Sequence, residues 1–152
     1  MVSWEQRKGD NAMADTKKFE TVAAFSTAAL LADGVYEESE KLAISSVAET
    51  LKINEKEMFD AIDVEIEKQA EMSDEDLDAY LKNIAKELNE NDMIEIFQVC
   101  LVIILSDGKL CKEETAILLS FADILNIDAV YATLIIAYMV NKESDLVVEI
   151  DI

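Results

Sequence analysis

Residues that interrupt helices are almost absent from this sequence: proline does not occur, and glycine occurs only three times in 152 residues. Inside a helix, proline is about 3 kcal/mol and glycine about 1 kcal/mol less favourable than alanine. Hydrophobic residues make up 51% of the chain, which is enough to form a core at this length. We therefore expect one all-α domain with about seven helices.

Apolar residues at helical spacing locate these helices. Asn54 with Glu57, and Ser73 with Asp76, have the spacing of helix N-caps and predict where two helices begin. The apolar pattern places Leu31 and Leu42 among the buried residues of the first two helices. The first two predicted helices cover about 16–32 and 37–51, and the third and fourth start at 54 and 73. The last three cover about 91–106, about 112–125, and 128 to about 140.

The two longest apolar stretches, IFQVCLVIIL and AVYATLIIAYMV, are shorter than the roughly 20 residues that span a membrane. We interpret both as buried core helices. Residues 1–15 form a polar N-terminal arm without an apolar stripe, residues 16–142 form the domain, and residues 143–152 form a C-terminal tail. The tail, DLVVEIDI, alternates weakly like a strand, but no partner strand is evident, so we expect it to be extended or disordered.

An Asp-Gly pair followed by five residues and a glutamate occurs twice, as Asp33-Gly34 to Glu40 and as Asp107-Gly108 to Glu114. The two copies lie 74 residues apart. The same offset superimposes apolar residues and N-cap candidates without a gap. It therefore predicts two pseudo-symmetric halves, each a helix, an Asp-Gly turn and two helices, with the fourth helix as connector. The matched pairs include Val22 with Ile96, Leu30 with Ile104, Val47 with Phe121, Leu51 with Leu125, Asn54 with Asp128 and Ile62 with Ile136.

Each copy of the motif has a purely structural explanation. Gly34 and Gly108 can end helices in the left-handed conformation, Tyr36 and Leu110 can anchor the turns in the core, and each glutamate lies near the start of a helix, where the dipole favours an anion. This explanation does not account well for an aspartate at the end of a helix in both copies. The motif also resembles the second half of an EF-hand loop, but apolar residues fill the first ligand positions, which excludes that site.

If the two turns meet, Asp33, Glu40, Asp107 and Glu114 gather four carboxylates, and such a cluster requires a cation or raised pKa values. Oxygen ligands suit Ca²⁺ or Mg²⁺. Glu38 and Glu113 are possible supplementary ligands. Cys111 lies in the second loop, where a spectator thiol is the simpler interpretation and a ligand for a softer ion the alternative.

Charge and composition exclude several function classes. The chain contains 33 acidic and 13 basic residues, a net charge of −20, and no histidine. Such a surface repels nucleic acid and anionic lipid, and attracts cations and basic proteins. Histidine-dependent nucleophiles and zinc sites are impossible within the chain. Cys100 and Cys111 form no C-x-x-C pair and are expected to be reduced thiols, with a disulfide or a soft-metal ligand as the alternatives.

The segments LADGVYEESEK, LSDGKLCKEET and FADILNIDAVY resemble the TerB proteins of tellurite resistance, and the related domain of some J-domain co-chaperones, over about residues 17–140. The resemblance implies seven helices with internal pseudo-symmetry and a metal site at Asp33, Glu40, Asp107 and Glu114. It also implies a stress-response role with other tellurite-resistance (ter) proteins at the inner membrane. The acidic body and the N-terminal arm depart from the family pattern.

Three functions remain open. The first is a non-enzymatic, cytoplasmic module that binds a divalent metal and associates with the inner membrane only through partners. The second is an acidic module of the same fold that binds a basic protein without metal. The third is a carboxylate–metal hydrolase, for which the sequence specifies neither a nucleophile nor a substrate pocket.

Overall fold

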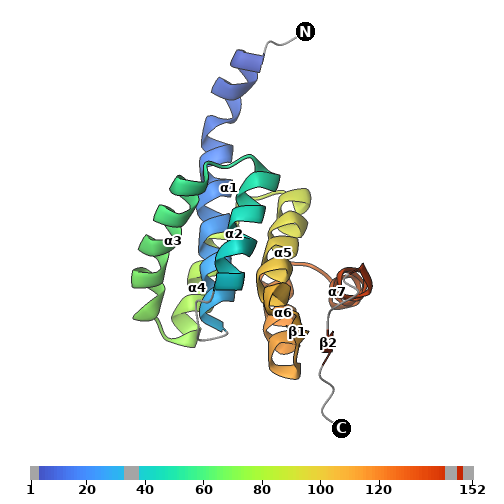
Figure 1. The fold of residues 1–152 in the computed structure, drawn as a ribbon. Helices are drawn as coiled ribbons and strands as arrows, with labels where there is room; N and C mark the ends of the chain where they lie inside the picture. Colours follow the sequence, from blue (N-terminus) through green and yellow to red (C-terminus); the bar gives the residue numbers. More distant parts are fainter. Residues whose placement is uncertain (1–3, 33–37, 143–146, 149–152) are drawn as a thin grey trace.

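The structure is a computed structural model that describes residues 4–32, 38–142 and 147–148. Its described residues form seven α-helices, one short 3₁₀ turn and a pair of two-residue strands, so the prediction of an all-α fold is confirmed (Figure 1). The elements are α1 (Trp4–Ala32), α2 (Glu38–Leu51), α3 (Glu55–Ala70), α4 (Asp74–Ala85), α5 (Glu90–Ile104), η1 (Leu105–Asp107), β1 (Lys109–Leu110), α6 (Lys112–Ile124), α7 (Ala129–Lys142) and β2 (Val147–Val148).

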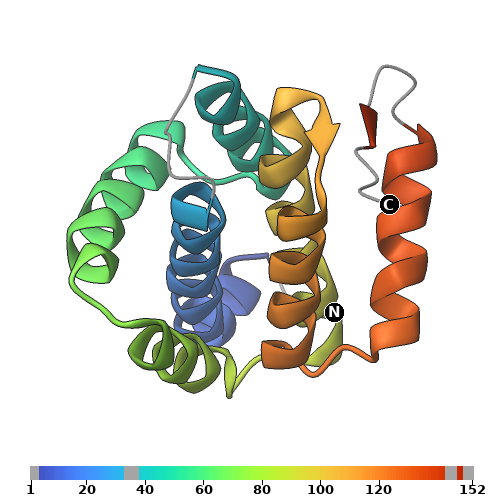
Figure 2. The ribbon, with the colours of Figure 1, turned by 90° about the horizontal axis from the view of Figure 1, so that it is seen from below.

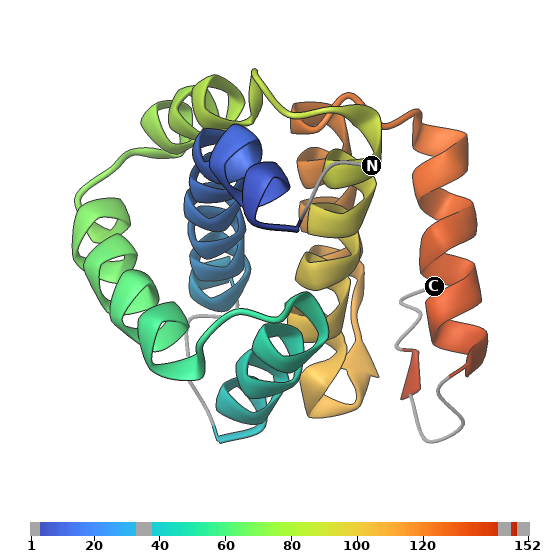
Figure 3. The same ribbon diagram turned by 90° about the horizontal axis from the view of Figure 1, so that it is seen from above.

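Helices α1 and α5 form the centre of the molecule and pack against each other along the bundle. In Figure 1 they run in the same direction and end at the same, lower end, where β1 also lies. Figures 2 and 3 show α3 and α7 at opposite sides, with α1 and α5 between them. The core therefore lies around the two central helices, with completely buried side chains such as Phe25, Ile44, Ile96, Phe97 and Leu118.

The internal repeat is present in the structure at the offset of 74 residues. Helices α2 and α3 begin at Glu38 and Glu55, and α6 and α7 begin at the equivalent positions. The turns that follow α2 and α6 each contain a residue with a φ of 58°, namely Lys52 and Asn126. In each turn the next residue donates its backbone amide to a carbonyl of the preceding helix at 2.8 Å, Ile53 to Ala48 and Ile127 to Ala122.

Local helix signals predicted the N-termini well. The backbone amide of Glu57 donates to Asn54 Oδ1 (3.1 Å), that of Asp76 to Ser73 Oγ (3.1 Å), and that of Val130 to Asp128 Oδ1 (2.9 Å). These bonds satisfy amides that the first turn of a helix would otherwise leave without a partner.

Four expectations at the level of elements and burial were wrong. Helix α1 begins at Trp4 rather than near residue 16, and its first part extends beyond the other helices (Figure 1). Leu31 and Leu42 are exposed, by 39% and 66%. Helix α5 is buried as expected, but α7 buries only one side, through Ala132 and Ile136.

The expectation of a tail without a partner strand was also wrong. Val147 and Val148 of β2 pair in parallel with Lys109 and Leu110 of β1. Two paired residues are too few to give a periodic pattern in the sequence, so this pairing of distant segments could not be predicted from it. The rest of the tail, 143–146 and 149–152, lies outside the described residues.

Candidate metal centre

The second Asp-Gly turn is closed by its own backbone. Helix α5 tightens into η1, Gly108 takes the left-handed conformation (φ 79°), and its amide donates to the Leu105 carbonyl (3.0 Å). The amide of Lys109 donates to Asp107 Oδ1 (3.0 Å), which fixes the aspartate over the turn. Leu110 is 4% exposed and anchors the turn in the core, as the sequence predicted.

Glu114 lies in the first turn of α6 and is buried, with 9% of its surface exposed. Its Oε1 accepts a hydrogen bond from the Cys111 amide (3.2 Å), and the positive end of the helix dipole lies beside it. Glu113 is exposed; its own backbone amide, followed by the neighbouring Cys111 thiol, holds the pKa of its carboxyl below the ordinary value. Conversely, a hydrogen bond with Glu114 raises the pKa of the Cys111 thiol.

The first turn is described only in part. Glu40, the counterpart of Glu114, is buried at 3% exposure in the first turn of α2. Glu38 is exposed and lies 3.9 Å from Lys41. The hydroxyl of Ser39 is buried and has no hydrogen-bond partner within the part of the chain that the structure describes. Asp33, Gly34 and Tyr36, which the sequence assigns to the turn, lie outside the described residues.

The fold brings the described parts of the two turns to one end of the bundle. Figure 1 shows α1 and α5 ending there together, and η1 packs against α2, the helix that carries Glu40. Within the described residues, however, no group of three or more histidine, cysteine, aspartate or glutamate side chains is arranged to hold a metal ion. The predicted four-carboxylate cluster includes Asp33 and so extends beyond this part of the chain.

The donor chemistry of the second turn fits a hard cation. The backbone amides of Lys109 and Cys111 donate to Oδ1 of Asp107 and Oε1 of Glu114, so each carboxylate has a second oxygen to which no described amide donates. No ion pair is found for Asp107, Glu113 or Glu114 among the described side chains. The Ser39 hydroxyl is a further oxygen at this end, and the sequence contained no signal that would have identified it.

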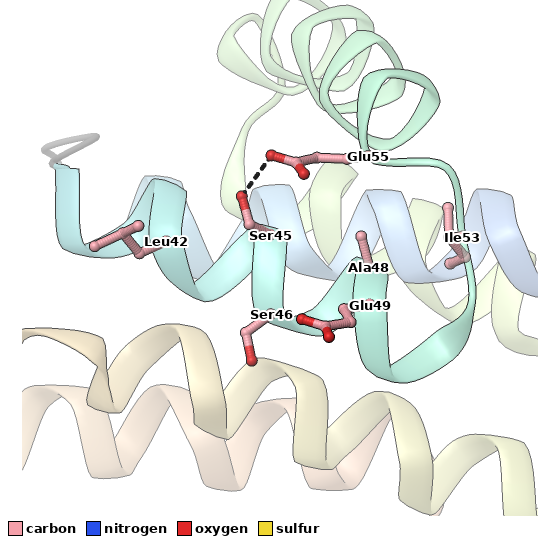
Figure 4. A pocket seen from close by; sticks show the side chains of 7 residues that line it. All are labelled: Leu42, Ser45, Ser46, Ala48, Glu49, Ile53 and Glu55. Atoms are coloured by element: carbon pink, nitrogen blue, oxygen red, sulfur yellow. Dashed lines mark hydrogen bonds between the residues drawn. The ribbon is translucent and has the colours of Figure 1, made fainter.

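A separate hollow of about 410 Å³ lies over α2 and the start of α3 (Figure 4). Ser45 donates a hydrogen bond to Glu55 (2.8 Å) across it, while Leu42, Ser46 and Glu49 line the remainder. Its lining consists of serine, glutamate and apolar side chains. We assign no chemistry to it, because the Ser45–Glu55 pair is exposed and no other residue of the lining is hydrogen-bonded to the Glu55 carboxylate.

None of the helices among the described residues combines the length and apolar character needed to cross a membrane.

Comparison with known proteins identifies a family. The family model described as "Tellurite resistance protein TerB" matches residues 19–135, which is most of the chain. No curated protein and no solved structure matches significantly. The matched segment includes both Asp-Gly motifs and every helix from α2 to α6. This chain therefore belongs to the tellurite resistance protein TerB family.

Proposed function

We propose that this chain is a non-enzymatic TerB module that binds one divalent cation, Ca²⁺ or Mg²⁺, between its two Asp-Gly turns. Asp33, Glu40, Asp107 and Glu114 would be the ligands, with Glu38 and Glu113 as supplementary ones. The cation would supply positive charge at the end of the bundle where the described parts of both turns lie. The proposed setting is tellurite resistance or stress response in the cytoplasm, with other tellurite-resistance proteins as partners that bring the module to the inner membrane.

One observation carries this proposal: the glutamates of both motifs are buried, at 3% and 9% exposure, at equivalent positions near the same end of the bundle. A buried carboxylate is unfavourable unless charge or hydrogen bonds compensate its lost hydration. For Glu114 the described compensation is the hydrogen bonds with the Cys111 amide and thiol, together with the helix dipole. A cation shared by the two motifs would add positive charge beside both glutamates.

The alternative is an acidic module that binds a basic protein without metal. Two observations favour it. The net charge is −20, and the hydrogen bonds to Asp107 and Glu114 already give both carboxylates a role in closing the turn.

Calorimetric titration of Ca²⁺ and Mg²⁺ at about 0.15 M salt, where exposed charges are screened beyond about 8 Å, tests the metal site. We expect saturable binding that Asp107→Asn and Asp33→Asn weaken, because affinity for hard cations depends on ligand charge. Glu57→Gln is the matched control. Glu57 lies in the first turn of α3, just as Glu40 lies in the first turn of α2 and Glu114 in that of α6, but it belongs to neither Asp-Gly motif.

Thermal unfolding supplies a second measurement. A cation at about 100 times its dissociation constant should stabilise the fold by about 2.7 kcal/mol. Asp107→Asn keeps an oxygen that can accept from the Lys109 amide, so in chelator its melting temperature should equal or exceed that of wild type. In saturating cation it should be lower than wild type. Absence of saturable binding, or wild-type affinity in both aspartate variants, contradicts the proposal.

A further inference from the structure

One face of α7 is apolar and exposed. Val130, Tyr131, Leu134 and Tyr138 recur at helical spacing along it and are exposed by 70%, 48%, 61% and 66%. We call these four residues the α7 outer face. Ala132 and Ile136, on the other side of the helix, are its buried residues. Figures 2 and 3 show α7 at the edge of the molecule.

The internal repeat shows that the fold does not require apolar residues at these positions. The equivalent positions of α3, 74 residues earlier, are Lys56, Glu57, Asp60 and Val64, and all four are exposed. Three of them are charged, and Lys56 forms an ion pair with Asp60 (2.9 Å). Apolar side chains therefore occupy all four positions in the second half, where the first half has three charged ones, and this difference points to a contact made by α7.

Two grooves flank the α7 outer face. One, of about 400 Å³, lies between α7, α2 and α5, and its apolar lining includes Val47, Val99, Val102 and Met139. The other, of about 430 Å³, lies between α7, the start of α5 and the α6–α7 turn, with Met93, Ile94 and Ile127 in its lining. Tyr138 borders the first groove and Tyr131 the second, so both grooves adjoin the α7 outer face.

Charge indicates which partner this surface fits. Glu90 and Asp128 line the groove at the N-terminal end of α7. Glu95 lines the other groove, but it already forms an ion pair with Lys18 (2.9 Å). The basic residue Lys142 also lines that groove. The unbalanced charge is therefore negative and lies at the N-terminal end. A second copy of the chain would bring another net charge of −20 against this surface, which is unfavourable.

We propose that the α7 outer face and its two grooves bind an amphipathic helix of a partner protein. Leucine-like side chains of that helix pack against Leu134 and Tyr138, in the manner of helices that insert an apolar side into a groove. Lysine or arginine at one end of the partner meets Glu90 and Asp128. Neither Asp-Gly turn contributes to this surface, so the inference goes beyond the proposed function and does not depend on a bound cation.

The test measures binding of a synthetic helical peptide, with leucine along one side and lysine at one end, to the full chain. Fluorescence anisotropy in chelator and about 0.15 M salt gives its affinity and keeps the result separate from the metal site. One control peptide has glutamate in place of lysine, and a second has the first composition scrambled so that no apolar side exists. We expect saturable 1:1 binding of the first peptide only.

Matched substitutions locate the binding site. Tyr138→Ser and Leu134→Ser should each weaken binding by about tenfold or more, as expected for anchors at the centre of an interface. Val64→Ser, at the position of α3 equivalent to Tyr138, should leave the affinity unchanged, and Glu90→Gln should reduce its dependence on salt. All four positions are exposed, so melting temperatures close to wild type should verify that the variants are folded.

The proposal is overturned if Tyr138→Ser and Leu134→Ser bind as wild type does, or if Val64→Ser weakens binding equally. Equal binding of the glutamate peptide or the scrambled peptide overturns it as well. Sedimentation that shows a dimer abolished by Tyr138→Ser assigns the face to a second copy, and binding to lipid vesicles abolished by that variant assigns it to a membrane. Either result contradicts the proposed occupant.

Discussion

At the scale of single residues, the two thiols occupy opposite environments. Cys100 is completely buried, with Sγ 3.8 Å from the Phe25 carbonyl oxygen, and burial raises its pKa far above the ordinary value. Cys111 is half-buried beside the second Asp-Gly turn, where the hydrogen bond with Glu114 is the largest cause of its raised pKa. Because the thiolate is the reactive form, exposure and pKa together determine the rate of modification.

We therefore expect the native protein to react with a disulfide reagent at one thiol, Cys111. Cys111→Ser should abolish that reaction until the chain is unfolded, whereas Cys100→Ser should leave it unchanged. Glu114→Gln should accelerate it, because the carboxylate that raises the Cys111 pKa is gone. Absorbance of the released thiol measures each rate, and two equally fast thiols in the wild type would contradict the assignment.

A second residue-scale feature connects α1, α3 and α4. Tyr80 donates to Glu65 Oε1 (2.6 Å), and Gln69 donates both to Glu65 Oε2 (2.9 Å) and to the Ala24 carbonyl (2.9 Å). Lys68 Nζ lies 4.5 Å from the centre of the Tyr80 ring. Burial, followed by the Glu65 carboxylate, raises the pKa of the Tyr80 phenol above its ordinary value of 10.0.

The raised pKa fixes the sign of a pH dependence. A phenol that holds its proton more tightly in the folded state stabilises the fold fully below about pH 10, and this stabilisation is lost as the pH rises further. Tyr80→Phe should lower the unfolding free energy by about 1 kcal/mol at neutral pH. From pH 10 to 11 its stability should fall less steeply than that of wild type. Urea unfolding across pH 7–11 measures both, and parallel curves would contradict the prediction.

At the scale of elements, the Asp-Gly turn depends on the conformation of one residue. Gly108 has a φ of 79°, and a Cβ added to it would meet no atom within 4 Å, so any cost of a side chain is conformational rather than steric crowding by neighbours. Gly108→Ala should lower the unfolding free energy by about 1–2 kcal/mol. Gly108→Asn should lower it less, because asparagine tolerates this conformation. Equal loss in both variants, measured by thermal unfolding with Lys109→Ala as control, would contradict this account.

The sequence predicted those structural elements whose signals lie within a few neighbouring residues. The caps at Asn54 and Ser73 and the end of a helix at Gly108 depend on three or four neighbouring residues, so they could be read directly. Two identical motifs at a fixed offset also predicted the repeat of helices. The pairing of β2 with β1 and the exposure of Leu42 depend on which distant segments meet, and one half-pattern of apolar residues does not determine this.

The candidate site was predictable to the same extent. The motif identified Asp107, Glu114 and Glu40, and their positions in tight turns and first helical turns are as expected. Their burial could not be read from the sequence, because a glutamate in the first turn of a helix is normally solvated. The apolar stretch of α7 was incorrectly interpreted as a core helix, because composition alone does not show which side of an apolar helix is buried and which is exposed.

At the scale of the whole molecule, the halves share a backbone plan but differ in surface. The first half presents a charged α3 to solvent, whereas the second presents the α7 outer face. Among the described side chains, the ion pairs involve few of the acidic residues, and most of these pairs are exposed. The net charge of −20 is therefore mostly not compensated by ion pairs, and its self-repulsion opposes the compact state.

This self-repulsion predicts a salt dependence. The Debye length falls from about 30 Å at 0.01 M to about 8 Å at 0.15 M salt, so NaCl should raise the melting temperature of the chelator-treated protein across this range. The rise should be the same in Asp107→Asn, since one charge in 20 contributes little to a repulsion spread over the surface. Calorimetric scans at constant pH measure it.

The comparison with divalent ions then separates screening from binding. At equal ionic strength, MgCl₂ or CaCl₂ should stabilise wild type more than NaCl does, because binding to the folded state adds to screening. This extra stabilisation should disappear in Asp107→Asn and persist in Glu57→Gln. If all three proteins gain equally from the divalent salt, the acidic surface attracts cations diffusely and the two turns are only helix ends.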